Sequence, residues 1–179
     1  MYAALIEYWF SDEVNARWFK STPEFDRQLL ARYGETWQLA RQGELDSWCD
    51  IAVGSLAMVI LLDQFPLNMF RGSAKSFSTE ARSRETARAA IDQGFDQDLT
   101  ASQKSFLYMP FMHSEDLDDQ ALALKLFDQP GLEKNLRFSR HHYGIVERFG
   151  RFPHRNEILG RKSTDSEVEY LNSKQGFKG

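Results

Sequence analysis

The stretch from Ile51 to Leu62 carries no charged side chain, and it limits the possible folds of this 179-residue chain more than any other segment. It is too short to cross a bilayer, which needs roughly 20 apolar residues. It is also apolar on nearly every side, which is typical of a helix surrounded by others. We therefore predict a buried central helix from Ile51 to about Phe65. Asp63, Gln64 and Pro66 are expected to end it.

The rest of the chain has the periodicity of helices. Apolar residues recur three or four positions apart, and β-branched residues are few, which predicts an all-α fold. Thr22 and Pro23 are typical of a helix start, Gly43 of a helix end, and Thr164 to Glu167 form a capping box. The expected helices are about 3–10, 23–43, 51–65, 79–94, 100–110, 114–127, 133–149 and 164–172.

Short turns between these helices predict antiparallel hairpins. No stretch rich in proline, serine or glycine separates parts of the chain, so we expect a single domain over residues 1–179 with a frayed tail from about residue 173. The content of 42% hydrophobic and 13% aromatic residues is that of a packed globule.

Charge and cysteine content exclude several classes of protein. The net charge of -4 argues against nucleic acid as a partner, because phosphate binding needs a dominant basic face. Cys49 is the only cysteine, so no intramolecular disulfide can form. The first residues lack a basic region and include Glu7, unlike a signal peptide. We expect a cytoplasmic protein without membrane contact, and no motif predicts a cofactor.

The first polar cluster follows the apolar helix and includes Asp63, Asn68 and Arg71. Asp63 comes directly after two leucines, and a buried carboxylate without a partner is costly. Arg71 or Arg148 would serve as that partner. The pair would be either structural or part of a binding or catalytic site.

The second cluster is His113-Ser-Glu-Asp116. Ser114 is expected to cap the next helix, with Glu115 and Asp116 in its first turn. Alternatively, His113 is a base or a metal ligand beside the carboxylates. A histidine two positions before a glutamate is a weak metal signal, and we predict no metal site.

The third cluster is the segment from Arg148 to Asn156. Gly150 favours a helix end, and Pro153 keeps the residue before it extended. Arg151, His154, Arg155 and Asn156 are therefore expected to project from a rigid bend toward solvent. The guanidinium groups would either bind a carboxylate or phosphate ligand, or be solvated or paired with acidic side chains of the protein itself.

Two adjacent histidines precede this segment. His142 lies on the apolar face of the helix, with Phe138 and Phe149, whereas His141 lies on the polar face with Arg148. A histidine on an apolar face is either a hydrogen-bonded core residue or a base whose pKa burial lowers.

Taken together, these stretches resemble an uncharacterised bacterial family, known as domain of unknown function 924. The resemblance rests on Leu61-Leu-Asp-Gln-Phe-Pro66 with Asn68 and Phe70-Arg-Gly72, on Tyr108-Met-Pro-Phe-Met-His-Ser-Glu-Asp116, and on Arg148-Phe-Gly-Arg-Phe-Pro-His-Arg-Asn156 with Leu159-Gly-Arg161. It implies a tetratricopeptide-like, right-handed helical array and no established activity. Leu67 departs from the family, which usually has a basic residue there.

Three hypotheses about function remain. In the first, which we favour slightly, the protein is a binding module whose arginines and histidines hold an anionic small molecule or an acidic peptide segment. In the second, it is an enzyme in which His142 or His113 is the base and Asp63 or Glu115 orients it. In the third, the polar clusters only join helix ends. The sequence does not predict the oligomeric state.

Overall fold

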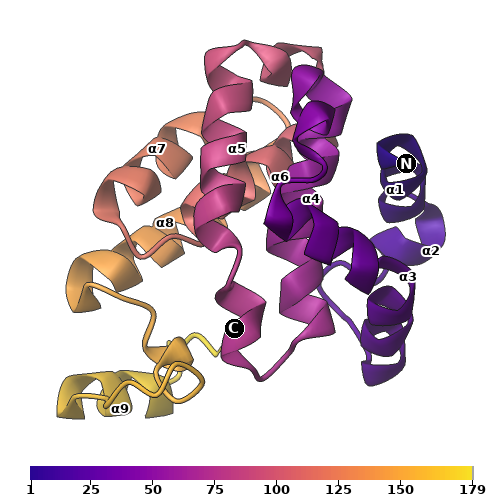
Figure 1. The fold of residues 1–179 in the computed structure, drawn as a ribbon. Helices are drawn as coiled ribbons and strands as arrows, with labels where there is room; N and C mark the ends of the chain where they lie inside the picture. Colours follow the sequence, from indigo (N-terminus) through magenta and orange to yellow (C-terminus); the bar gives the residue numbers. More distant parts are fainter. Residues whose placement is uncertain (179) are drawn as a thin grey trace. The chain divides into compact units, whose positions relative to one another are not determined.

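Helices account for the regular structure of residues 1–178, the part of the chain that the computed structural model describes, and no strand occurs among them (Figure 1). The predicted all-α class is therefore confirmed. The chain divides into two compact units. The first contains Met1–Arg71 and Lys75–Pro110, and the second contains Gly72–Ala74 and the residues from Phe111 onward. The single domain and the tetratricopeptide-like arrangement stay predictions.

The first unit is organised around one helix, α4 (Ala52–Met69), which contacts α1 (Tyr2–Trp9), α3 (Pro23–Gln42) and α5 (Glu80–Asp92). The first unit also contains α2 (Asp12–Asn15), most of α6 (Ala101–Met112), and the short 3-10 turns η1 (Asp46–Asp50) and η3 (Phe95–Asp98). A further turn, η2 (Ala74–Phe77), begins in the second unit and continues into the first. The predicted stripe of α3 is buried, and it consists of Phe25, Leu29, Tyr33 and Trp37.

The predicted end of the central helix was wrong, because α4 continues through Pro66 to Met69. A proline in a helix has no N–H, which leaves the carbonyl four residues earlier without its usual donor. Here Thr79 supplies the missing donor, since its hydroxyl donates to the Leu62 carbonyl at 2.6 Å. The same hydroxyl accepts from Trp37 Nε1 at 3.3 Å. Thr79 thus joins α3 to α4. It stands at the N-cap position of α5, but its side chain makes no capping hydrogen bond there.

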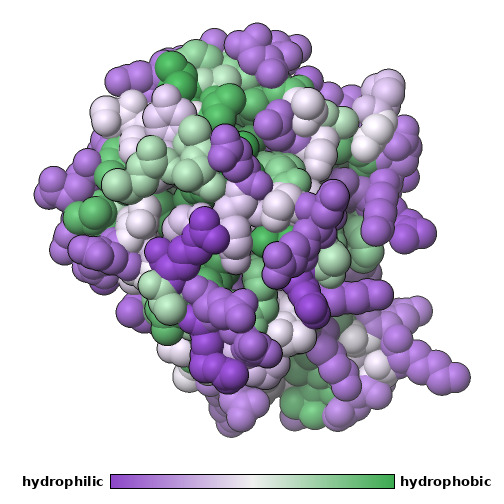
Figure 2. All heavy atoms as spheres, turned by 90° about the vertical axis from the view of Figure 1, so that its right-hand side faces the viewer, coloured by the Kyte–Doolittle hydropathy of each residue, from purple (hydrophilic) through white to green (hydrophobic). Residues whose placement is uncertain are grey.

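By length and composition, α4 is the one helix among the described residues that would be able to cross a membrane. However, 83% of it is buried inside the protein, as in the core helix of a globular domain. On the side of α1 to α3, hydrophobic residues lie scattered among hydrophilic ones (Figure 2). Scattered apolar side chains such as Phe19, which is 69% exposed, are common on protein surfaces.

In the second unit, α7 (Leu117–Phe127) packs against α8 (Glu133–Phe149), and α9 (Asp165–Asn172) contacts the 3-10 turn η4 (Pro153–Arg155). Several local predictions are confirmed. Gly150 ends α8 with a φ of 69°, and Thr164 forms the capping box of α9. The predicted cap of α7 was wrong: the Asp116 side chain accepts from the backbone N–H groups of Asp118 and Asp119, while Ser114 Oγ donates to Asp119 at 2.8 Å.

Candidate functional site

The predicted residues of the first unit form one hydrogen-bonded group near the end of α4. Asp63 is 2% exposed and accepts a hydrogen bond from Gln64 Nε2 at 2.6 Å. Arg71 pairs with Asp26 (Nε to Oδ2, 2.8 Å) and donates to Asn68 Oδ1 at 2.9 Å. Much of the hydrogen-bonding capacity of this group is therefore used within the unit. Its part in binding or catalysis stays a prediction.

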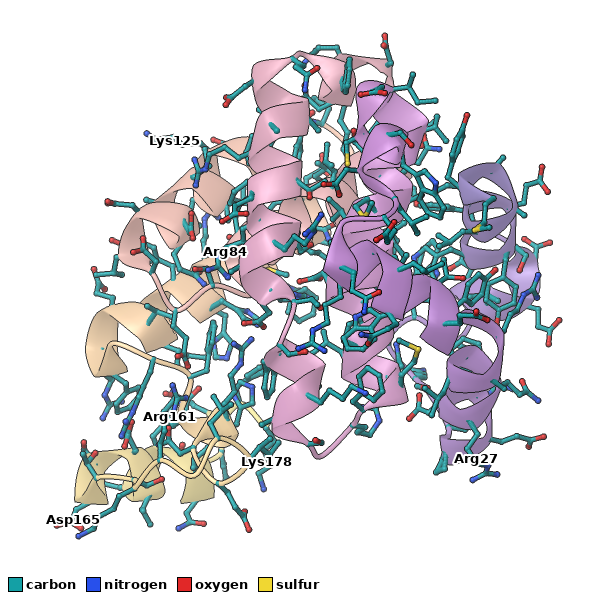
Figure 3. The ribbon with its side chains drawn as sticks, viewed as in Figure 1. Arg27, Arg84, Lys125, Arg161, Asp165 and Lys178 are labelled. Carbon is teal, nitrogen blue, oxygen red and sulfur yellow. The ribbon has the colours of Figure 1, made fainter. Side chains whose placement is uncertain are left out.

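In the second unit, Glu115 links two segments that are far apart in sequence. Its Oε1 accepts from the Phe152 N–H at 2.8 Å, and its two oxygens lie 2.6 and 2.9 Å from the guanidinium nitrogens of Arg161, which is labelled in Figure 3. Burial acts to raise the pKa of Glu115, but the hydrogen bonds from Arg161 and Phe152 outweigh burial and lower it. Glu115 is thus held as a carboxylate by a bidentate arginine.

A second bidentate pair connects the segment after α8 to the start of α9. Arg151 Nε lies 2.6 Å from Glu167 Oε1, and its Nη2 lies 2.8 Å from Oε2. Glu167 is 2% exposed, and its Oε2 also accepts from the Thr164 N–H at 2.7 Å. The hydrogen bonds from Arg151, together with those from Thr164, lower the pKa of Glu167 to about 2. Arg151 therefore fixes the position of α9.

Arg155 and Asn156 lie inside the second unit, so the prediction that they project toward solvent was wrong. Arg155 is 6% exposed, and its Nη2 donates to the His113 carbonyl at 3.0 Å. Its guanidinium carbon also lies 4.7 Å from the centre of the Phe152 ring. Asn156 is 1% exposed and donates to Ser163 Oγ at 3.1 Å. Buried polar side chains require such partners, and only the folded chain brings these partners together.

His142 is as buried as its place on the apolar face predicts, with 7% exposure. Its Nδ1 lies 2.9 Å from the Phe138 carbonyl. A carbonyl only accepts, so Nδ1 carries the hydrogen and Nε2 has the free lone pair. Burial lowers the pKa of His142 to about 3.

His154 is also held in its neutral form. Burial lowers its pKa to about 4, and the positive charge of Arg155 acts in the same direction. Its Nδ1 is buried without a hydrogen-bond partner among the described residues. At neutral pH both His142 and His154 are therefore uncharged.

A groove of about 650 Å³ lies between α8 and the end of α9. None of its lining residues is a carboxylate. Arg140, His141 and Arg148 come from α8, and Lys174 follows α9. The groove is completed by Gly144, Ile145, Phe149, Tyr170 and Gln175. We call this feature the α8–α9 groove.

A smaller hollow of about 370 Å³ shares Arg148 and Phe149 with this groove. It is also lined by Arg151, Thr164, Ser166 and Glu167, so its one arginine–carboxylate pair is the Arg151–Glu167 pair. Arg148 therefore lines both the α8–α9 groove and this smaller hollow.

Sequence reasoning found Arg148 and missed Arg140 and Lys174. One signal for Arg140 was present: it lies eight residues before Arg148, which places both on one face of a helix. No comparable signal marks Lys174, because its position depends on how the chain folds after α9. Among residues 1–178, no group of three or more histidine, cysteine, aspartate or glutamate side chains is arranged to hold a metal ion.

Comparison with known proteins identifies the family. A family model described as bacterial protein of unknown function (DUF924) matches residues 5–175. The chain belongs to this family. This match agrees with the resemblance found in the sequence motifs. A solved structure of a protein of unknown function from Agrobacterium tumefaciens is also similar, with 39% identity, 96% coverage of each chain and a TM-score of 0.91. No match was found among curated proteins.

Proposed function

We propose that this bacterial DUF924 protein binds a small anionic molecule with an apolar or aromatic part, in the cytoplasm, and that the α8–α9 groove is the binding site. The observation that carries the proposal is the composition of the groove. Cationic and apolar side chains line it together, and no carboxylate lies among them.

The cations of the groove are available to a ligand. Arg140, Arg148 and Lys174 are exposed, and within residues 1–178 none of them forms an ion pair. The guanidinium of Arg148 lies 4.7 Å from the centre of the Phe149 ring and 6.0 Å from that of Tyr170. These ring contacts orient Arg148 without neutralising its charge. In a chain with net charge -4, such a local cationic cluster favours an anion.

The size and the apolar side chains of the groove indicate the ligand class. Its volume falls within the range of small-molecule sites, roughly 300–1,000 Å³. Guanidinium groups bind carboxylates and phosphates through paired hydrogen bonds. Ile145, Phe149 and Tyr170 would contact the apolar part of the ligand. An aromatic carboxylate or phosphate monoester fits both features.

The enzyme hypothesis has weaker support in the second unit. A histidine with a pKa of about 3, such as His142, is a poor proton acceptor at neutral pH. The Nδ1 of His142 bonds to a backbone carbonyl, and Glu115 bonds to Arg161, so neither forms the base–orienter pair that the hypothesis requires.

Titration with phenyl phosphate tests the proposal, with inorganic phosphate as the matched ligand that lacks the ring. We expect phenyl phosphate to bind more tightly, because its ring contacts the apolar side chains of the groove. Arg148→Gln should weaken binding by about ten-fold, the size expected for a charged hydrogen bond, without lowering the melting temperature. Added salt should weaken binding as well.

Arg137→Gln is the matched control, because Arg137 is exposed on the same helix but does not line the groove. It should leave the affinity for phenyl phosphate unchanged. Absence of binding to the wild type, or equal losses in the Arg148 and Arg137 variants, would contradict the proposal.

A further inference from the structure

The chain after α9 makes specific contacts past residue 173, where the sequence predicts fraying. Ser173 Oγ donates to the Tyr170 carbonyl at 2.7 Å, and the Phe177 N–H donates to Tyr170 Oη at 3.1 Å. Gly176 fits closely against α9: a Cβ at this position would lie 2.6 Å from the Tyr170 carbonyl oxygen and 2.7 Å from that of Leu171. This arrangement therefore requires glycine at position 176.

The ring of Phe177 lies among three imidazole rings. Its centre is 5.9 Å from that of His141, 4.8 Å from that of His142 and 4.9 Å from that of His154. The ring planes meet at 73°, 65° and 83°, which is the edge-to-face geometry that aromatic pairs prefer. We call His141, His142 and His154 the histidine socket.

The socket is suited to an apolar ring because two of its histidines are uncharged at neutral pH. Burial lowers the pKa of both His142 and His154, and the Phe177 ring packs against both of their rings. The charged and titratable groups that face them are His113 for both, His141 and His154 for His142, and Glu115, Arg155 and Arg161 for His154. Of these, Glu115 alone favours the protonated form of His154.

The tail also supplies part of the groove. Lys174 and Gln175 line it, and they lie between α9 and Phe177. Because the chain is held at Tyr170 on one side and at Phe177 on the other, the position of Lys174 depends on both contacts. Loss of the Phe177 contact would leave Lys174 free to move away from the groove.

We propose that the histidine socket is a binding site for an aromatic side chain, that Phe177 of the same chain occupies it, and that this occupancy places Lys174 in the α8–α9 groove. The last part rests on the proposed function. The first two parts stand on the ring contacts and on the fit of Gly176, and they are tested separately.

Nuclear magnetic resonance of the histidine rings tests the socket. In Phe177→Ala, the pKa values of His142 and His154 should each rise by about one unit or more, because water reaches the rings. Gly176→Ala should have the same effect although it keeps Phe177. Lys178→Ala is the control and should change neither value. Unchanged values in both the Phe177 and Gly176 variants would overturn the socket.

The peptide acetyl-Gly-Phe-amide tests whether the socket binds an aromatic side chain from outside. In Phe177→Ala it should shift the His142 and His154 resonances saturably and lower their raised pKa values. In the wild type, where Phe177 fills the socket, it should not. Equal responses in the two proteins, or none in the variant, would overturn the assignment of a binding site.

Phenyl phosphate titration tests the link to the groove. Phe177→Ala and Lys174→Ala should each weaken binding by about five-fold, as expected for one exposed charge contact, and the double variant should be no weaker than either. If the wild type binds phenyl phosphate and Phe177→Ala binds it equally well, the link is wrong but the proposed function stands. If the wild type does not bind it, the proposed function fails, and the socket is judged from the histidine pKa values.

Discussion

Acidification from about pH 7 to about pH 5 should destabilise the second unit through His142 and His154. Both histidines have folded-state pKa values well below the ordinary value of 6.5, at about 3 and about 4. The unfolded chain therefore binds more protons than the folded chain between about pH 4 and pH 6.5. In this window the free energy of unfolding rises with pH, and the stabilisation is fully present only above about pH 7.

The size of the effect follows from these values. Around pH 5 an unfolded histidine is almost fully protonated, whereas His142 and His154 in the folded unit remain mostly neutral. Relative to pH 7, each therefore lowers the free energy of unfolding by about 2 kcal/mol, or about 4 kcal/mol for both if they act independently. Glu115 and Glu167 have lowered pKa values, so their effect on stability falls mainly below pH 4.5, the ordinary pKa of a glutamate. The interval from pH 5 to pH 7 thus separates the histidines from the carboxylates.

Urea unfolding followed by far-ultraviolet circular dichroism is the appropriate measurement. All four tryptophans lie in the first unit, so tryptophan fluorescence reports that unit, whereas dichroism reports the helices of both. His142→Asn keeps a donor at the position of Nδ1, and His154→Gln removes the buried Nδ1 that lacks a partner.

Each of these variants should remove about half of the pH dependence. The reasoning is refuted if the wild type loses less than about 1 kcal/mol between pH 7 and pH 5, or if the double variant keeps the full dependence.

Three further substitutions give distinct outcomes in thermal or urea unfolding. Gly54→Ala should cost about 3 kcal/mol, because its Cβ would lie 2.0 Å from the Trp48 carbonyl oxygen, and a wild-type stability would contradict that packing. Gly144→Ala, also within a helix but with no atom within 4 Å of the new Cβ, should instead stabilise by about 0.5–1 kcal/mol. Arg151→Ala should lower the melting temperature by several degrees, because Glu167 would keep its buried charge without its bidentate partner; an unchanged value would restore Arg151 as a free ligand-binding residue.

The structure separates two roles that the sequence combined in one segment. Arg151 joins the segment after α8 to α9, Arg155 joins η4 to the residue after α6, and Asn156 joins the end of η4 to the segment before α9. These are contacts of the kind that the third hypothesis describes. Arg148, from the same segment, faces the groove and has no carboxylate partner among the described residues. We therefore propose the arginines of the helix face, and not those of the bend, as ligand-binding residues.

Local sequence was sufficient where a structure depends on residues a few positions apart. The start of α3 at Pro23, its end at Gly43, the span of α8 from Glu133 to Phe149 and the capping box at Thr164 were all predicted. Caps and amphipathic stripes involve residues three or four apart, so the sequence displays them directly.

Predictions failed where the deciding partner is distant in sequence. Pro66 is accommodated within α4 because Thr79 bonds to the carbonyl that the proline leaves free. Arg155 is buried because the His113 carbonyl, 42 residues earlier, accepts its hydrogen bond. In both cases the sequence contains the residues but not their proximity.

The sequence by itself determined that the chain is helical, where most helices begin and end, that it belongs to the DUF924 family, and that His142 is buried. Only the tertiary structure decided which arginines are paired, which line a groove, and that Phe177 lies against three histidines. The physical reason is that helix formation and burial follow from local periodicity, whereas the pairing of charges and the packing of rings depend on distances between segments that only folding sets.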